Sequence, residues 1–268
     1  REKAFGNEAR DYGLPSPKGI ALIGIPGTGK SLTAKTIAGL WRLPLIRLDV
    51  GALFGGLVGQ SEENPRRALN LAETVSPCLL WIDEIEKGLS MGGGDGGTSM
   101  RVFGSILSWM QEKTKPVFVV ATANNISHLP PELLRKGRFD EIFFLDLPTF
   151  KERKEIFEVH LRKRKRMVQE YDIEKMAKAA EGYVGAEIEQ VIIDAMYLAF
   201  SDKMNQGRDF TTGDVLEALK RQVPLSSSQS EAINALRLWL TEGRAQSASF
   251  TEKQQAQEQF VQIQLSAN

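Results

Sequence analysis

The residues best suited to chemistry lie in one glycine-rich segment near the start of the chain. Residues 24–31 read GIPGTGKS and match GxxxxGK[ST] at every fixed position. Glycines let backbone N–H groups surround phosphate oxygens, and the amino end of the following helix attracts the same anions. Lys30 is expected to reach the β- and γ-phosphates of a nucleotide, and Ser31 to bind Mg²⁺. The expected nucleotide-binding residues of this segment are Pro26, Gly27, Thr28, Gly29, Lys30, Ser31 and Leu32.

Two carboxylates stand at the end of an apolar run further along the chain. Residues 78–82 read CLLWI and are followed by Asp83 and Glu84. An apolar strand that ends in two carboxylates is the expected partner of a phosphate-binding loop. Asp83 is expected to hold Mg²⁺, mostly through water, and Glu84 to polarise the attacking water, a role worth about 10²–10⁴ in rate. Glu86 continues the acidic run and is expected to be a solvated helix residue.

An amide side chain follows a third apolar run. Residues 117–121 read VFVVA, and Asn124 comes shortly after them. Beside the nucleotide-binding strands, this amide can hold the catalytic water or contact the γ-phosphate. Asparagine is also a frequent turn residue, so the pattern alone leaves both interpretations open.

The elements that must position these residues alternate along the chain. Continuous apolar runs are typical of parallel strands buried on both faces, and helical patterns separate them. This alternation predicts an α/β fold with a P-loop NTPase parallel sheet and helices on both faces. The expected strands cover residues 20–23, 45–50, 78–82, 117–121 and 142–145, and the expected helices roughly 30–41, 61–75 and 99–113.

After Pro148 the pattern changes to helices only. We therefore expect a large α/β nucleotide-binding domain at 1–148, a small helical lid domain at 149–222, and a C-terminal helix and tail at 223–268. Within the last two parts, Thr211 with Asp214 resembles a capping box. Ser227 is expected to cap a final helix that Gly243 ends. The apolar residues of that helix are Ile233, Leu236, Trp239 and Leu240.

Composition narrows the classes of function. Thirty-four Lys and Arg balance thirty-four Asp and Glu, which argues against a generally basic nucleic-acid binder. Cys78 is the one cysteine, so an intramolecular disulfide is excluded and a reducing compartment is favoured. No apolar run approaches about 18 residues, so no membrane span is expected. The first residue is Arg1 rather than Met, which is compatible with a piece of a longer protein.

Taken together, these motifs resemble those of the AAA ATPases, from about Gly13 to Leu219. Within that family the chain is most similar to the Ycf-type AAA ATPases of cyanobacteria and algal plastids. The segments that carry this likeness are WRLPL at 41–45, LFGGLVG at 53–59, GAEIEQ at 185–190 and VPLS at 223–226.

The resemblance implies further site residues. Asn124 takes the place of the family's first sensor. Arg135 and Arg138, in the segment LRKGRFD, take the place of the arginine fingers that reach the γ-phosphate held by a neighbouring subunit. Without the family, the same two arginines read as scattered charge on a surface loop.

The resemblance also implies residues around the sugar and base of the nucleotide. His160 takes the place of a histidine that packs near the ribose, although a plain helix histidine fits the pattern equally. Gly185 and Ala186 match the lid turn that lines the adenine pocket. Gly13 lies where the family's adenine-side loop precedes the first strand.

Two features modify this picture. The family's protein-threading members usually carry an aromatic residue in the first central-pore loop, and Leu57 holds that position here, so weak gripping of a peptide is expected. Residues 162–166 are five consecutive basic residues, which suit nucleic acid or an acidic partner, but the neutral chain and the absence of interleaved aromatic residues favour a solvated helix end.

The function predicted from these observations is Mg²⁺-dependent ATP hydrolysis coupled to remodelling of a protein target. The chain is expected to act in a ring-like homo-oligomer, expected to be a hexamer. Two alternatives stay open: an ATP-dependent binding switch with little turnover, and an ATPase stimulated by nucleic acid. The expected location is the cytoplasm, or the plastid stroma for a plastid-encoded chain.

Overall fold

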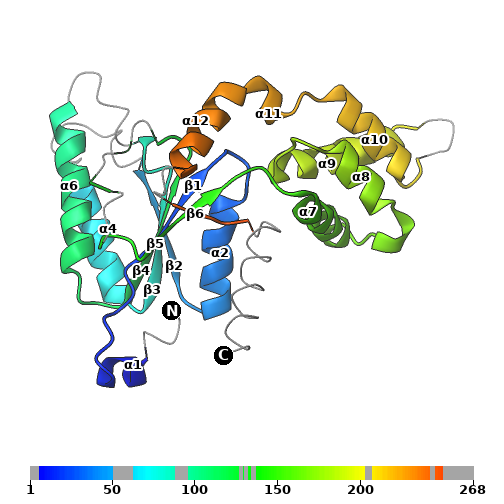
Figure 1. Cartoon of the computed structure of the whole chain (residues 1–268). Helices are drawn as coiled ribbons and strands as arrows, with labels where there is room; N and C mark the ends of the chain where they lie inside the picture. Colours follow the sequence, from blue (N-terminus) through cyan, green and yellow to red (C-terminus); the bar gives the residue numbers. More distant parts are fainter. Residues whose placement is uncertain are drawn as a thin grey trace, which may run out of the picture. The chain divides into compact units, whose positions relative to one another are not determined.

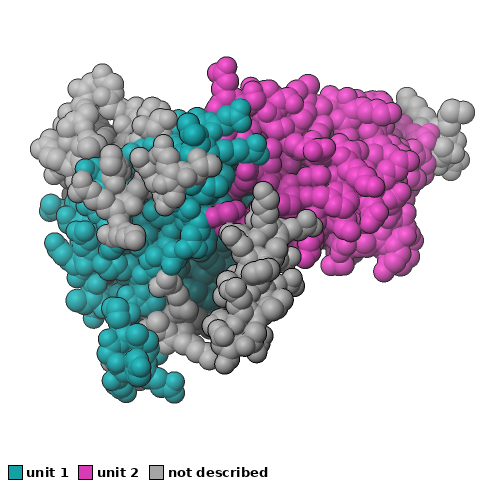
Figure 2. Space-filling view, in the orientation of Figure 1, with its two compact units in different colours: residues 1–144, 234–246 teal, residues 145–233, 247–268 magenta. Residues whose placement is uncertain are grey.

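The computed structural model describes residues 6–50, 63–87, 96–126, 129, 132–133, 137–202, 207–241 and 245–249. The chain divides into two compact units, coloured separately in Figure 2. Unit 1 comprises residues 1–144 and 234–246, and unit 2 comprises residues 145–233 and 247–268. Each unit is described by itself below.

A six-stranded sheet forms the centre of unit 1, in the order β2-β3-β4-β1-β5-β6. The pairings of β2 with β3, β3 with β4, and β4 with β1 are parallel, which confirms the predicted α/β fold. Every residue of β1 and β4 is buried, because central strands of such a sheet are covered on both faces. The strands are β1 (Gly19–Gly24), β2 (Leu45–Asp49), β3 (Cys78–Asp83), β4 (Val117–Ala123), β5 (Glu141–Leu145) and β6 (Gln246–Ser247).

Helices cover the two faces of this sheet. Figure 1 shows α2 (Lys30–Trp41) on one face, and α4 (Glu63–Val75) and α6 (Gly96–Glu112) on the opposite face. A short helix, α1 (Asn7–Asp11), precedes the amino end of β1 and lies away from the amino end of α2 (Figure 1). Because the strands are parallel, the carboxyl ends of β1, β3 and β4 meet at one edge of the sheet, where α2 begins.

Gly19 at the start of β1 lies where the sheet leaves no room for a side chain. A Cβ atom built on Gly19 would lie 2.0 Å from the carbonyl oxygen of Val119 in β4, and its φ is +149°. Both features require glycine. The close approach of β1 to β4 therefore depends on this residue.

Unit 2 is helical around its own apolar core. Its helices are α7 (Phe150–Lys163), η2 (Val168–Glu170), α8 (Ile173–Ala179), α9 (Gly185–Phe200), α10 (Thr212–Arg221) and α11 (Leu225–Ser228). The core has aromatic and aliphatic members from every long helix, among them Phe157, Leu161, Met176, Ile188, Ile192, Ala195 and Val215. Thr149 caps α7: its hydroxyl accepts the N–H of Glu152, whose carboxylate accepts the N–H of Thr149.

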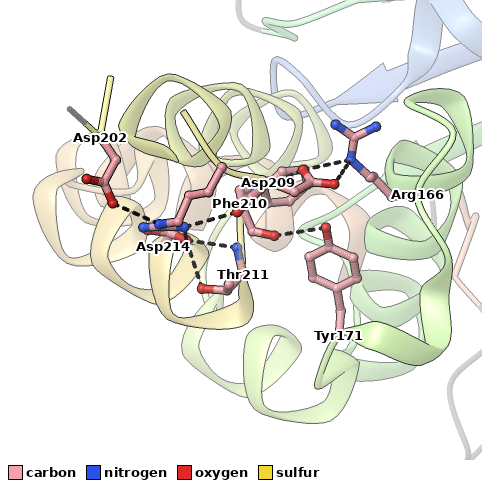
Figure 3. A network of polar contacts seen from close by, with 8 residues as sticks. Arg166, Tyr171, Asp202, Asp209, Phe210, Thr211 and Asp214 are labelled. Atoms are coloured by element: carbon pink, nitrogen blue, oxygen red, sulfur yellow. Dashed lines mark hydrogen bonds and ion pairs between the residues drawn. The ribbon is translucent and has the colours of Figure 1, made fainter. Parts of the chain in front are cut away.

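A network of ion pairs closes the turn that leads into α10 (Figure 3). Arg208 donates to both carboxylate oxygens of Asp214 at 2.7 Å and to Asp202 at 3.0 Å. The carboxylate of Asp214 also accepts the N–H and the hydroxyl of Thr211, each at 2.8 Å. The hydrogen bonds from Arg208 lower the pKa of Asp214 most, and those from Thr211 lower it further. The predicted pairing of Thr211 with Asp214 is confirmed.

The prediction for Ser227 is wrong. Ser227 lies inside the short helix α11, which begins after Pro224, and the final helix α12 (Ser230–Thr241) starts three residues later. The N–H of Ser227 donates to the carbonyl of Pro224, so the chain already turns helically before the expected cap. The predicted apolar residues of α12, Ile233, Leu236 and Trp239, are buried as expected.

Candidate active site

The phosphate loop, residues 24–31, joins β1 to α2 as its sequence predicts. Gly27 and Gly29 have φ of +80° and +97°, a region that side chains disfavour. Gly29 caps α2, and the hydroxyl of Thr28 donates to the carbonyl of Ile25 at 2.8 Å. Ser31 and Leu32 follow Lys30 in the first turn of the helix. The loop is thereby held in a fixed curl at the carboxyl edge of the sheet.

Lys30 is buried, with 6 % of its surface exposed. Its ammonium group donates to the carbonyls of Gly24 at 2.9 Å and Ile25 at 2.7 Å. Burial lowers the pKa of Lys30 to about 8, while the charges of Glu86, Glu84 and Asp83 act in the opposite direction. Its electrostatic interaction with these three carboxylates ties the phosphate loop to the end of β3.

Asp83, the last residue of β3, is held through both carboxylate oxygens. The hydroxyl of Thr122 in β4 donates to Oδ1 at 2.8 Å, and the guanidinium of Arg47 in β2 donates to Oδ2 at 2.9 Å. Arg47 also lies 4.9 Å from the ring centre of Trp81. The carboxylate is thus oriented by the two strands that flank β3.

Glu84 and Asn124 lie together, as the parallel strands require. The amide nitrogen of Asn124 donates to Glu84 Oε1 at 3.1 Å, and Lys87 forms an ion pair with the other carboxylate oxygen. Glu84 has φ of +48°, which few residues with a side chain adopt. The backbone therefore turns sharply at the residue predicted to activate water.

Glu86 departs from its prediction. It is buried, not solvated, and its Oε1 accepts the backbone N–H of Asn124 at 2.9 Å. Burial raises the pKa of Glu86, and this hydrogen bond opposes the change. Glu86 turns inward because Asn124, the residue directly after β4, offers its backbone N–H group there. Sequence reasoning missed this role and that of Thr122.

The donor set at this edge fits magnesium. Ser31 offers a hydroxyl and Asp83 a carboxylate, and Mg²⁺ prefers such oxygen ligands. Within the described part of the chain, no three His, Cys, Asp or Glu side chains gather as a metal-binding group. Mg²⁺ bound with substrate phosphates needs only one or two protein ligands, so two oxygens suffice.

Comparison with known proteins agrees with this geometry. Residues 20–147 match the model of the ATPase family associated with various cellular activities (AAA), and residues 170–213 match that of the AAA+ lid domain. The chain belongs to the AAA family. The first match thus covers the phosphate loop, Asp83, Glu84 and Asn124, and the second lies within unit 2.

Relatives of this AAA chain differ widely in similarity. It is 54 % identical over 254 residues to the uncharacterized AAA domain-containing protein ycf46 of Pyropia yezoensis, a match that covers 94 % of the chain and 51 % of the relative. It is 33 % identical to the proteasome-activating nucleotidase of Aeropyrum pernix, covering 79 % of the chain and 52 % of the relative. It is also 33 % identical to the ATP-dependent zinc metalloprotease FtsH of Thermotoga maritima, covering 83 % and 37 %. The chain spans about half the length of the first relative.

The AAA lid residues predicted from the resemblance lie in unit 2. His160 on α7 contacts Glu189 on α9, with 3.3 Å between Nδ1 and Oε1, and burial lowers its pKa. Gly185 and Ala186 form the first turn of α9. Glu187 holds this turn: its carboxylate accepts the N–H of Val184 and the N–H of Leu225. These contacts leave the predicted roles of His160, Gly185 and Ala186 as predictions.

Other predicted residues are not brought into this cluster. Arg138 is partly buried, and its NH1 nitrogen has no hydrogen-bond partner among the residues that the structure describes. Gly13 is exposed and precedes the amino end of β1, whereas the phosphate loop follows the carboxyl end. Arg135 and Leu57 lie outside the described residues.

The basic run at 162–166 is largely paired with carboxylates. Arg162 contacts Glu158, Lys163 and Arg164 contact Glu189, and Arg166 contacts Asp209. This favours the solvated helix end over a nucleic-acid surface.

A separate groove of about 500 Å³ lies on unit 2. Its lining contains none of the predicted site residues and consists of Asp194, Tyr197, Leu198, Ser201, Ala218 and Arg221. None of the helices searched within the described residues is both long and apolar enough to span a membrane.

Proposed function

We propose that this AAA chain hydrolyses ATP with Mg²⁺ and uses the energy to remodel a protein target. The observation that carries the proposal is the convergence of Lys30, Asp83, Glu84 and Asn124 at one edge of the sheet. Lys30 neutralises phosphate charge, and Glu84, oriented by the amide of Asn124, polarises the attacking water. Bound Mg²⁺, held by Ser31 and Asp83, would supply further neutralisation of the phosphates.

The decisive experiment separates binding from turnover. Lys30→Ala removes a charge-assisted contact and should weaken ATP binding about 10–100-fold. Glu84→Gln keeps the shape of the side chain but cannot accept a proton, so ATP should bind normally while turnover falls about 10²–10⁴-fold. Equilibrium binding of a fluorescent ATP analogue and release of inorganic phosphate measure the two effects.

A matched control comes from the surface of unit 2. Glu217 pairs with Arg221 on an exposed face of α10, so Glu217→Gln makes the same chemical change away from the candidate site. Parent-like turnover is expected for this variant. If Glu84→Gln also hydrolyses ATP at the parent rate, Glu84 is not the base. If the parent itself releases no phosphate, the chain does not hydrolyse ATP.

Membership of the AAA family and the names of two relatives support a proposal for the assembly and for the kind of target. We propose a ring-like homo-oligomer, expected to be a hexamer, in which Arg135 and Arg138 complete a neighbour's site. The names of two relatives, a proteasome-activating nucleotidase and an ATP-dependent protease, support the proposal that the target is a protein.

Burial of Cys78 raises the pKa of its thiol, and this inert cysteine suits a reducing compartment such as the cytoplasm or a plastid stroma.

One observation favours the alternative of a binding switch with little turnover. Glu84 is engaged by both Asn124 and Lys87, so a neighbouring cation, itself 59 % exposed, competes with the attacking water for the base. Lys87→Ala tests this contact, because release of Glu84 should raise turnover if the ion pair restrains it. Unchanged turnover would leave Lys87 as a surface charge only.

A further inference from the structure

The hydroxyl of Thr122 lies between the two residues of the acidic pair, Asp83 and Glu84. It donates to Asp83 Oδ1 at 2.8 Å and accepts the backbone N–H of Glu84 at 3.0 Å. Only 1 % of Thr122 is exposed, so water cannot replace either contact. A single buried oxygen therefore links the carboxylate proposed for Mg²⁺ to the backbone of the proposed base.

The backbone of Thr122 adds a third contact to the same turn. Its carbonyl accepts the N–H of Ile85 at 3.0 Å. Glu84, between these anchored groups, has φ of +48°, a conformation that persists only where the surroundings impose it. Thr122 thus fixes the turn on both sides of Glu84, and the direction of the Glu84 side chain follows from it.

The other oxygen of Asp83 has a different kind of partner. Oδ2 is paired with Arg47, whose side chain is 55 % exposed, whereas the side chain of Asp83 is 12 % exposed. An ion pair to an exposed arginine exchanges readily with solvent ions. Thr122 is therefore the fixed partner of Asp83, and Arg47 the exchangeable one.

We propose that Thr122 is a positioning residue for ATP hydrolysis, one that sets both the metal-binding carboxylate and the water-activating glutamate. This inference rests on the proposed function. Thr122 acts through Asp83 and Glu84 rather than on the nucleotide itself. Groups that orient metal ligands in this way typically change metal affinity or activity about 10–100-fold when removed.

The test replaces the hydroxyl by a methyl group. Thr122→Val keeps the branched shape but can neither donate to Asp83 nor accept from Glu84. Turnover number should fall about 10–100-fold, and the Mg²⁺ concentration for half-maximal turnover should rise about tenfold. Thr122→Ser retains the hydroxyl and should recover most of both losses. A rescue of this kind would not be seen if only packing mattered.

A readout independent of turnover uses a fluorescent ATP analogue titrated with and without Mg²⁺. Thr122→Val should reduce the gain in affinity that Mg²⁺ provides, while affinity without Mg²⁺ stays within about twofold of the parent. This separates the inference from the proposed function, because a parent that binds nucleotide without hydrolysing it still shows the Mg²⁺ effect.

Val119→Ala is the control for general weakening of β4. Val119 is fully buried in the same strand. Its apolar side chain can neither donate a hydrogen bond to Asp83 nor accept one from Glu84. This variant should melt at a lower temperature yet keep the parent's Mg²⁺ dependence. Parent-like turnover and Mg²⁺ dependence of Thr122→Val would overturn the proposal. So would a loss that Val119→Ala shares, or one that Thr122→Ser fails to repair.

Discussion

Lys30 experiences two opposed influences. Burial favours its neutral form, whereas three nearby carboxylates favour the ammonium, and burial prevails so that the pKa falls to about 8. Its two carbonyl partners belong to the phosphate loop itself. A lysine poised near physiological pH can take up a proton when an anion arrives.

We predict that nucleotide affinity depends on the protonation of Lys30. Phosphates bind the ammonium form, so binding raises its pKa and takes up a proton at pH values above about 8. Affinity should be flat below pH 7 and should fall about tenfold per pH unit above pH 8. Equilibrium binding between pH 6.5 and 9.5 measures this, and calorimetry in buffers of different ionisation enthalpy measures the proton.

Lys113 provides the control for this pH effect. Its pKa is also lowered to about 8 by burial, but its ammonium donates to the carbonyl of Val117, at the amino end of β4. Lys113→Met should keep the pH dependence of binding, whereas Lys30→Ala should abolish it. An affinity that stays constant from pH 7 to 9.5 in the parent would contradict the prediction.

At the scale of single residues, the sequence predicted which residues lie at this edge of the sheet where a motif fixes both residue type and strand position. Lys30, Asp83, Glu84 and Asn124 each end or follow a strand, and parallel strands bring such ends together. The roles of Thr122 and Glu86 were not predicted, because each residue bonds to groups that are distant in the sequence and that only the folded sheet brings near. A polar residue directly ending an apolar run, two positions before Asn124, was the one available sign of Thr122.

Among the elements, β1 and β4 approach each other so closely at Gly19 that a side chain cannot fit. Gly19→Ala would place a methyl group 2.0 Å from the carbonyl oxygen of Val119, which must displace one of the two strands. We expect a loss of about 3 kcal/mol in the stability of unit 1. Urea denaturation followed by tryptophan fluorescence measures it, since Trp41, Trp81, Trp109 and Trp239 all belong to unit 1.

Gly39 offers the matched substitution at an exposed position of a helix. A Cβ on Gly39 in α2 meets no atom within 4 Å, so Gly39→Ala should gain about 0.5–1 kcal/mol. Equal effects of the two substitutions would show that the contact with Val119 is not limiting. The strands β1, β3 and β4 were predictable because their apolar runs are continuous, whereas the two-residue β6 and the break between α11 and α12 carry no comparable signal.

For the molecule as a whole, the proposed ring makes activity a property of assembly. Arginine fingers contribute about 10³–10⁵ in kcat, so Arg138→Ala should bind ATP normally and hydrolyse it poorly. Mixing it with Lys30→Ala should restore some turnover, because intact fingers then meet intact nucleotide sites at some interfaces. Turnover at the parent rate by a dilute, demonstrably monomeric sample would exclude this arrangement.

Arg138 needs a stability control, because part of its guanidinium is buried. The unfolding of Arg138→Ala, followed by tryptophan fluorescence, should match that of the parent if the residue serves a neighbour. A large loss of stability, with no recovery on mixing, would assign Arg138 to the fold of its own unit.

The strand order constrains how unit 1 can fold while the ribosome synthesises the chain. Gly19 at the start of β1 pairs with Val119, and the other neighbour of β1 is β5, so no strand emerging before residue 117 can pair with it. The strands β2, β3 and β4 can join one another as they are made, but the strand that carries the phosphate loop waits for a long loop to close. A nascent chain that ends before β4 lacks the partner strand of β1, so we expect that it does not bind a nucleotide. Once β4 is available, a bound nucleotide stabilises the pairing of β1 with β4 by mass action, so the ligand contributes to the folding of unit 1 before β5 and β6 join the sheet.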